Sequence, residues 1–219
     1  MKILCIADHI DPLVYSSGIK ARFKDVELVL SAGDLPLGYY DFIVSTLNKP
    51  LLFVFGNHNL KGLDSYTRAH GVEARFSPLR REEGQATGAV HISGRVRRER
   101  KVLVAGLGGS RWYNGGENQY TDLQVWLHLA AMAPRLALNR LRFGRYLDVL
   151  LTHAPPFGVQ DGQDPCHRGF KALLWFMRVF KPRYLVHGHI HLYSGEARRV
   201  TRYGQTLVVN AYDHAVIEL

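Results

Sequence analysis

The chain has 219 residues, and its 28 Lys and Arg against 19 Asp and Glu give a formal net charge of +9. A composition of 47% hydrophobic and 21% charged residues excludes intrinsic disorder and fibrous repeats. The two cysteines, Cys5 and Cys166, are too few for a disulfide framework and lack the spacing of a thiolate zinc site, so we expect reduced, small hydrophobic residues. No Pro-, Gly- or Ser-rich linker divides the chain, which predicts a single domain over residues 1–219.

The first ten residues, MKILCIADHI, lack the long apolar core and small-residue cleavage site of a signal peptide. No stretch approaches the roughly 20 apolar residues that span a membrane. These features predict a soluble, cytoplasmic protein. The positive charge favours nucleic acid, an acidic lipid surface or an anionic substrate as partner, and the oligomeric state is left open.

Short apolar runs recur along the chain and end in polar residues. They are rich in Val, Ile, Leu and Phe and do not alternate, which is typical of strands buried on both faces. In chain order, the predicted strands are Lys2–Ala7, Val26–Ser31, Leu51–Phe55, Leu147–Leu151 and Tyr184–Val186.

Helical segments are predicted between these strands, at Tyr39–Leu47, Asp64–His70, Thr121–Arg145 (interrupted at Pro134) and Phe170–Phe180. Two further stretches, Ala89–Gly106 and Glu196–Val209, carry β-rich arms around a polar turn and predict antiparallel hairpins. The whole pattern indicates an α/β fold with a mixed sheet or two stacked sheets, covered by helices.

Polar side chains gather where the predicted strands end, which is the edge at which open α/β sheets bind ligands. These residues are Asp8, Asp34, Asn57, His58, His153, His189 and His191. Taken singly, an Asp at a strand end is usually a turn former and a lone His is usually structural. In the string GHxH, two imidazoles share one face of an extended segment, and the joint occurrence of all the motifs predicts a site.

Carboxylates, imidazoles and an amide oxygen without thiolates suit Mn, Fe, Zn or Ni. A central carboxylate can bridge two ions, an arrangement used for in-line displacement at phosphorus. The sequence therefore predicts one or two divalent metal ions at this edge of the sheet.

The order D…GD…GNH…H…GHxH, from Asp8 to His191, resembles the calcineurin-like metallophosphoesterase superfamily. The stretches SAGDLPLGYYDFIV, VFGNHN, LLTHAPPFGVQD and DPCHRGF…VHGHIHLY resemble a bacterial branch of it. The resemblance implies an α/β (α+β) fold, a four-layer αββα sandwich of two mixed β-sheets flanked by helices. It also implies hydrolysis of a phosphomonoester or phosphodiester by a metal-bound hydroxide.

The resemblance further implies which residues form the site. One metal site would use Asp34, Asn57, His153 and His189, and the other would use Asp8, the bridging Asp34 and His191. Asp34 and His58 would be the catalytic residues, with His58 contacting the scissile phosphate and protonating the leaving group.

One departure from the family pattern concerns the metal site that would use Asp8, Asp34 and His191, which we call the first metal site; the site of Asp34, Asn57, His153 and His189 is the second. The family usually opens with D-x-H, whose His is a ligand, whereas this chain has Asp8-His9-Ile10. Ile10 cannot ligate, and strict alternation points His9 away from Asp8, although His9 or Asp11 could substitute if the chain leaves the strand early. We expect a weaker first site and an intact second one.

A second departure is Asn59, where GNH is usually followed by Asp or Glu. An amide can orient an imidazole but cannot offset its charge. We therefore expect His58 to be a weaker base, with a lower apparent pKa on the acid limb of the pH–rate profile.

Arginines supply most of the excess charge, in two clusters: Arg95, Arg97, Arg98, Arg100 and Lys101, then Arg135, Arg140, Arg142 and Arg145. Such runs usually form solvated faces, although the second is also compatible with an amphipathic lid, a dimer face or a phosphate-backbone contact. No nucleic-acid motif accompanies them, so a phosphoester is the favoured partner and nucleic acid is not.

Residues in Gly-containing loops near the motifs are candidates for substrate binding. Arg111 suits bidentate recognition of a phosphate. The others are Asn114, His167, Asp161 and Asp164. Two alternative functions remain: a nuclease, and a phosphate- or nucleotide-binding protein that keeps the fold with weakened catalysis.

Overall fold

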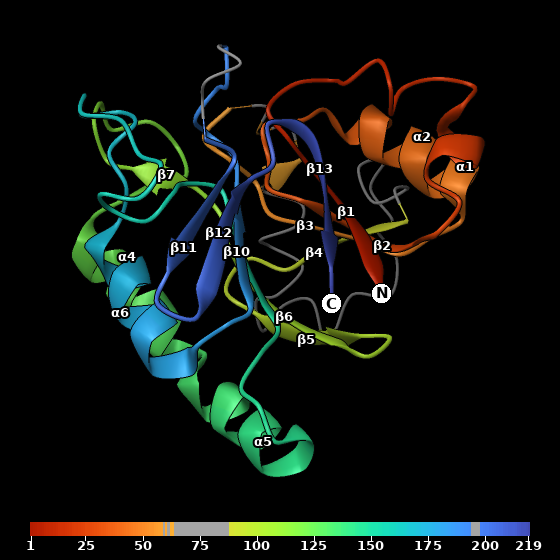
Figure 1. Ribbon diagram of the computed structural model, residues 1–219. Helices are drawn as coiled ribbons and strands as arrows, with labels where there is room; N and C mark the ends of the chain where they lie inside the picture. The colour runs from red at the N-terminus through yellow and green to blue at the C-terminus, as the bar shows by residue number, and fades with distance from the viewer. Residues whose placement is uncertain (59, 61, 64–87, 194–197) are drawn as a thin grey trace, which may run out of the picture.

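The structure is a computed structural model that describes residues 1–58, 60, 62–63, 88–193 and 198–219 (Figure 1). Five strands form one sheet, in the spatial order β13 (Asp213–Glu218), β1 (Lys2–Ala7), β2 (Val26–Ser31), β3 (Leu51–Phe53) and β4 (Ala89–His91). Six form a second sheet, in the order β11 (Val200–Tyr203), β12 (Thr206–Asn210), β10 (Tyr184–His187), β9 (Val149–Thr152), β6 (Val102–Leu107) and β5 (Val96–Glu99). A short pair consists of β7 (Ser110–Arg111) and β8 (Gln119–Tyr120).

Both sheets are mixed, with parallel strands at their centres and antiparallel strands at edges. In the first sheet β1 to β4 are parallel and β13 is antiparallel. In the second, β12, β10, β9 and β6 are parallel, whereas β11 and β5 are antiparallel. The carboxyl ends of the parallel strands in each sheet therefore lie at a common edge.

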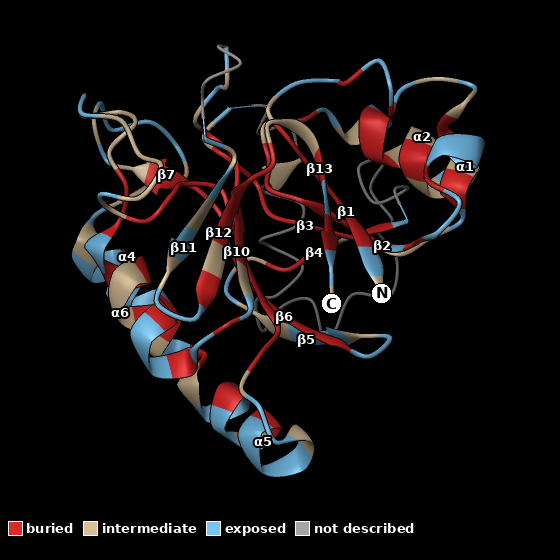
Figure 2. Ribbon diagram, in the orientation of Figure 1, coloured by how far each residue is buried: buried red, intermediate tan, exposed pale blue. Residues whose placement is uncertain are grey.

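Helices cover the outer face of each sheet, and the two sheets pack face to face. In β1, Ile3 and Cys5 point into the apolar core that both sheets share, whereas Leu4 and Ile6 pack towards the helices. The helices on that side are α1 (Ile19–Arg22) and α2 (Leu37–Leu47). The helices on the other side are α4 (Asp122–Ala131), α5 (Ala133–Phe143) and α6 (Lys171–Phe180). Figure 2 shows buried strands between helices whose outer faces are exposed, which confirms the predicted αββα sandwich.

Most predicted elements occur close to their expected bounds. The break at Pro134 separates α4 from α5, because proline is tolerated in the first turn of a helix but not in its interior. Thr121 begins α4 with a capping box that includes Gln124. The predicted helix Asp64–His70 lies outside the described residues. Among the residues that are described, no helix is long and apolar enough to cross a membrane.

The expectation of one hairpin over Ala89–Gly106 is wrong. Its first arm, β4, lies parallel to β3 in the first sheet, and the hairpin is β5 paired with β6 in the second. Ile92 is buried in the core between the sheets, where the chain passes from one to the other. An apolar strand has the same sequence pattern whichever sheet it joins, because the sheet is decided by pairing with strands distant in the chain. The second hairpin is confirmed as β11 and β12, and residues 196 and 197 of its expected span lie outside the described residues.

A buried carboxylate joins the amino ends of the central strands in the second sheet. Asp148 is 5% exposed, and its side chain accepts hydrogen bonds from the Leu103 amide (2.8 Å) and from Nε and Nη2 of Arg145 (2.6 and 3.0 Å). Its backbone carbonyl accepts from the amides of Arg183 and Tyr184. Arg145, which we expected on a solvated face, therefore helps to hold β6, β9 and β10 together.

Replacing Asp148 by Ala should lower the free energy of unfolding by about 2–3 kcal/mol, because it leaves a buried amide without its acceptor. Urea denaturation measures this change. Asp25→Ala is the matched control, since Asp25 forms an exposed ion pair with Lys2 at 3.4 Å and its loss should cost about 0.5 kcal/mol or less. Equal costs for the two variants would contradict this role of Asp148.

Candidate metal centre

Three of the expected ligands share an uncommon backbone conformation where the chain leaves a strand. Asp8, Asp34 and His189 have φ angles of 65°, 58° and 67°. Residues other than glycine rarely adopt this left-handed region, which costs about 1–2 kcal/mol per residue. Such strain persists where the surrounding structure enforces it, and it clusters at functional sites.

The buried imidazole of His153 lies at the centre of the site. Its Nδ1 is 2.8 Å from the carbonyl of Ala32, to which it can donate a hydrogen bond. Its Nε2 lies 3.0 Å from Oδ1 of Asn57 and 3.3 Å from Oδ2 of Asp34. With Nδ1 as donor to a carbonyl, Nε2 and two oxygens are three electron-rich atoms that need a shared cation between them, either a proton or a metal ion.

The carboxylate of Asp8 completes a compact group. Its two oxygens each accept the His189 amide at 3.0 Å, and its own amide donates to the carbonyl of Gly33 at 3.1 Å. Ligand atoms of Asp8, Asp34 and His153 all lie within 4.8 Å of one another. Two carboxylates and an imidazole from three strand ends are thus close enough to share an ion.

Burial and neighbouring charge act differently on these groups. Burial, with the nearby Asp34, raises the pKa of Asp8 to about 6. Burial would also raise the pKa of Asp34, but His153 and the His58 amide lower it to about 2. For His153, burial lowers the pKa, and the two carboxylates more than offset this effect and raise it to about 9. The site therefore strongly favours a positive charge at the position of His153.

His189 and His191 are not among the three side chains whose ligand atoms lie within 4.8 Å of one another, but both carry a ring nitrogen with a hydrogen-bond partner outside that group. The ring of His189 is 4.9 Å from that of His153, and its Nε2 is 2.7 Å from the carbonyl of Cys166, which leaves Nδ1 for a ligand. Burial lowers the pKa of His189 to about 3, which keeps the ring neutral. Nδ1 of His191 is hydrogen-bonded to the hydroxyl of Tyr193, which leaves its Nε2 for a ligand.

The residues near Ile10 do not replace the missing imidazole. Nδ1 of His9 lies 2.7 Å from Oδ1 of Asp213, on the neighbouring strand β13. Asp11 accepts hydrogen bonds from the amide of Leu13 and from His214. Ile10 itself is 38% exposed. Both candidate substitutes for the imidazole therefore have partners elsewhere.

Two motif glycines allow the carboxylates to approach the backbone closely. A Cβ at Gly56 would lie 2.0 Å from Oδ1 of Asp34 and 2.5 Å from Cε1 of His153. A Cβ at Gly188 would lie 2.5 Å from Oδ2 of Asp8. Any side chain at these positions would displace a candidate ligand, so GNH and GHxH need glycine for steric reasons.

Of the other predicted site residues, His58 and His167 contact proposed metal ligands, whereas Asn114 is hydrogen-bonded within its own loop. The amide of His58 donates to Oδ1 of Asp34 at 2.8 Å, and its side chain is exposed at the rim. The ring of His167 lies 5.2 Å from that of His189. Oδ1 of Asn114 accepts hydrogen bonds within its own loop, from the Gly116 amide and Gln119.

Two further candidates have polar neighbours of their own, and a third lies outside the described residues. Arg111 Nη1 lies 3.8 Å from Asp122. Asp161 accepts a hydrogen bond from the amide of Gly169. The residue outside the described ranges is Asn59. Sequence reasoning missed the carbonyls of Ala32 and Cys166, because a backbone acceptor has no sequence signal.

Known proteins share this arrangement of strands and helices. The sequence profile of the calcineurin-like phosphoesterases matches residues 1–193. A search of curated protein sequences found no significant match. One solved crystal structure aligns with 99% of this chain and 94% of its own, with a TM-score of 0.66 and 16% identity.

Two named structures also align at low identity. The protein TT1561 of Thermus thermophilus has a TM-score of 0.61 and 16% identity, over 97% of this chain and 89% of its own. GAP50, described as the anchor in the inner membrane complex of Plasmodium, has a TM-score of 0.56 and 10% identity, over 96% and 70%. These similarities establish a common fold alone. Because the family profile covers most of the sequence, including every site motif, the chain belongs to the calcineurin-like phosphoesterase family.

Proposed function

We propose that this protein is a metal-dependent phosphoesterase that hydrolyses a phosphomonoester or phosphodiester. The observation that supports the proposal best is the convergence of His153 Nε2 with oxygens of Asn57 and Asp34 around a position that requires a cation. Asp8 adds a second carboxylate within the same compact group. The donor set of carboxylate, imidazole and amide oxygen fits Mn, Fe, Zn or Ni.

The residues proposed to hold one or two ions are Asp8, Asp34, Asn57, His153, His189 and His191. Divalent ions bound there would neutralise phosphoryl oxygens and lower the pKa of a bound water. A ligand atom of Asp34 lies within 4.8 Å of those of both Asp8 and His153, which suits a shared ligand. The carbonyls of Ala32 and Cys166 would orient the rings of His153 and His189.

His58 is proposed as the residue that contacts the scissile phosphate and protonates the leaving group. Its amide is held by the carboxylate of Asp34, while its imidazole is exposed at the rim, where a substrate can reach it. A histidine so placed can act as the general acid towards the leaving oxygen.

A phosphate- or nucleotide-binding protein of the same fold is the second candidate. The observation that favours it is the pairing of His9 with Asp213 and of Asp11 with His214, beside Ile10. These contacts leave the first metal site one imidazole short. A weakly filled first site would reduce hydrolysis while the second site still bound an anion.

His58→Ala should reduce hydrolysis of an aryl phosphomonoester or a bis-aryl phosphodiester at least about 100-fold in the presence of Mn²⁺, because general acid catalysis contributes about 10²–10⁴-fold. Release of the aryl alcohol measures the rate. His128→Ala is the matched control, since His128 is exposed on α4 and contacts Tyr120. Metal binding with no turnover in the unaltered protein would instead favour the binding protein. Steeply salt-dependent binding of DNA or RNA would favour a nuclease.

The first site should be the weaker of the two. After loading with Mn²⁺ and extensive dialysis, elemental analysis should find about one Mn per chain, because only the second site keeps its full ligand set. Ile10→His should raise that count towards two, whereas Ile10→Leu should leave it unchanged. Two tightly held Mn ions in the unaltered protein would contradict a weakened first site.

Gly56→Ala should weaken metal binding at least about tenfold, because the added methyl group would collide with the carboxylate of Asp34. Isothermal titration with Mn²⁺ measures the affinity. The matched control is Gly38→Ala in α2, where a Cβ meets nothing within 4 Å. Unchanged Mn²⁺ affinity in folded Gly56→Ala protein would argue against Asp34 as a ligand.

A further inference from the structure

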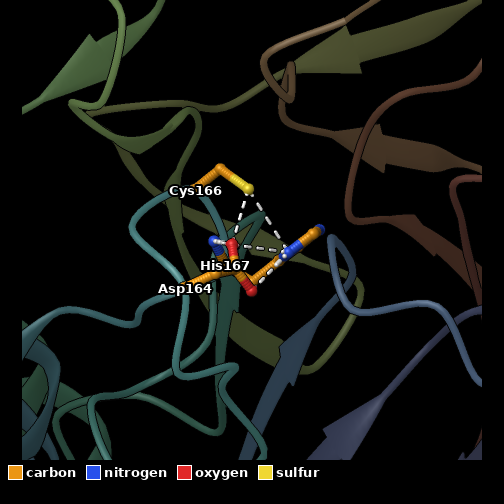
Figure 3. Close-up of side chains that lie close together, drawn as sticks. All are labelled: Asp164, Cys166 and His167. Atoms are coloured by element: carbon orange, nitrogen blue, oxygen red, sulfur yellow. Dashed lines mark hydrogen bonds and ion pairs between the residues drawn. The ribbon is translucent and has the colours of Figure 1, made fainter.

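A second cluster of potential ligands lies in the loop between β9 and α6. Asp164, Cys166 and His167 point towards one another (Figure 3). Sγ of Cys166 lies 2.7 Å from Oδ1 of Asp164 and 3.3 Å from Nδ1 of His167. The same Nδ1 lies 3.0 Å from both oxygens of Asp164. A thiol, a carboxylate and an imidazole therefore converge from four consecutive residues.

We propose that Asp164, Cys166 and His167 form a separate binding site for a thiophilic divalent cation of the Zn²⁺ class. None of the residues proposed for the phosphoesterase centre supplies a thiolate. A sulfur ligand selects Zn²⁺ and similar ions over Mg²⁺, Ca²⁺ and Mn²⁺, which prefer oxygen. The two sites would consequently differ in metal preference.

The distances within the cluster suit one ion. Zn²⁺ bonds of about 2.0–2.3 Å at tetrahedral angles separate neighbouring ligand atoms by about 3.4–3.6 Å. The three observed separations are 2.7, 3.0 and 3.3 Å, each short of that range by less than about 1 Å. Small side-chain rotations would open the cluster enough to admit the ion.

The loop is also shaped around these side chains. A Cβ at Gly162 would lie 2.6 Å from Cβ of His167 and 3.0 Å from Oδ2 of Asp164. The Gly162 amide donates to the carbonyl of His167 at 2.9 Å, and the Gly169 amide donates to Asp161 at 3.0 Å. Glycine at 162 thus permits the close approach of the loop to the cluster, whose Asp164 and His167 side chains are half-exposed.

Binding of the divalent ion releases one proton from the cluster. The thiol of Cys166 loses its proton to solvent when sulfur bonds to the ion, and the carboxylate of Asp164 exchanges its hydrogen bonds for a metal bond. The imidazole of His167 binds through Nδ1 in its neutral form. Water takes the open position, so no other reactant is required.

The loop site of Asp164, Cys166 and His167 would be coupled to the proposed phosphoesterase centre through the backbone. The carbonyl of Cys166 lies 2.7 Å from Nε2 of His189, and the rings of His167 and His189 are 5.2 Å apart. An ion in the loop would therefore fix the group that orients His189. This coupling rests on the proposed function, whereas the site itself does not.

Titration of the full-length, metal-depleted protein with Co²⁺ tests the proposal directly. Thiolate bonded to Co²⁺ gives a charge-transfer band in the near ultraviolet, which carboxylate, amide and imidazole ligands do not give. Cys5, the other cysteine, is 0% exposed in the core. We expect a band that saturates at about one ion per chain, disappears when Zn²⁺ is added, and is absent from Cys166→Ser.

Two further variants make the test specific. Cys5→Ala should keep the charge-transfer band, and Asp164→Asn should weaken Co²⁺ binding at least about tenfold while the band remains. Co²⁺ d–d bands without a thiolate band would mean that only the phosphoesterase centre binds and would overturn the proposal. Identical Co²⁺ spectra from the wild type and Cys166→Ser would show that the cluster is a hydrogen-bonded loop only. A thiolate band without phosphoester hydrolysis would support the loop site and count against the proposed function.

Discussion

The structure depends on one electrostatic requirement, which is the need for positive charge beside His153. Its Nδ1 faces a backbone carbonyl, and its Nε2 faces the oxygens of Asn57 and Asp34, and the imidazole itself is fully buried. In a medium of low dielectric constant such acceptors cannot be left without a cation. A buried ion pair of this kind adds little to stability and is better explained by binding.

The fold meets this requirement by bringing strand ends of two sheets together. Asp8 and Asp34 follow β1 and β2 in one sheet, whereas His153 and His189 follow β9 and β10 in the other. The shared apolar core fixes the distance between the sheets, and left-handed residues at three of these strand ends turn the side chains over their common edge. Motif glycines then remove the Cβ atoms that would separate the ligands. Packing energy from the core thus offsets the strain and desolvation at the site.

The loop from Asp161 to Gly169 links this centre to its surroundings. It supplies the carbonyl that orients His189, and it carries a thiol, a carboxylate and an imidazole of its own. In the sequence, no second cysteine lies at a metal-binding spacing from Cys166. An isolated cysteine of this kind usually acts as a small hydrophobic residue. Its neighbours Asp164 and His167 become relevant to it only because the loop folds back on itself.

The sequence by itself indicated the central parallel strands and the ligand motifs, since buried parallel strands have continuous apolar runs and a metal site needs particular donor atoms, and its resemblance to a known family implied the sandwich. It also indicated the break at Pro134, which follows from local stereochemistry. Only the tertiary structure decided that Ala89–His91 pairs with β3, that His9 and Asp11 have partners on β13, and that carbonyls orient two imidazoles. Each of these contacts joins residues distant in the chain or involves the backbone, and neither kind is encoded in local residue pattern.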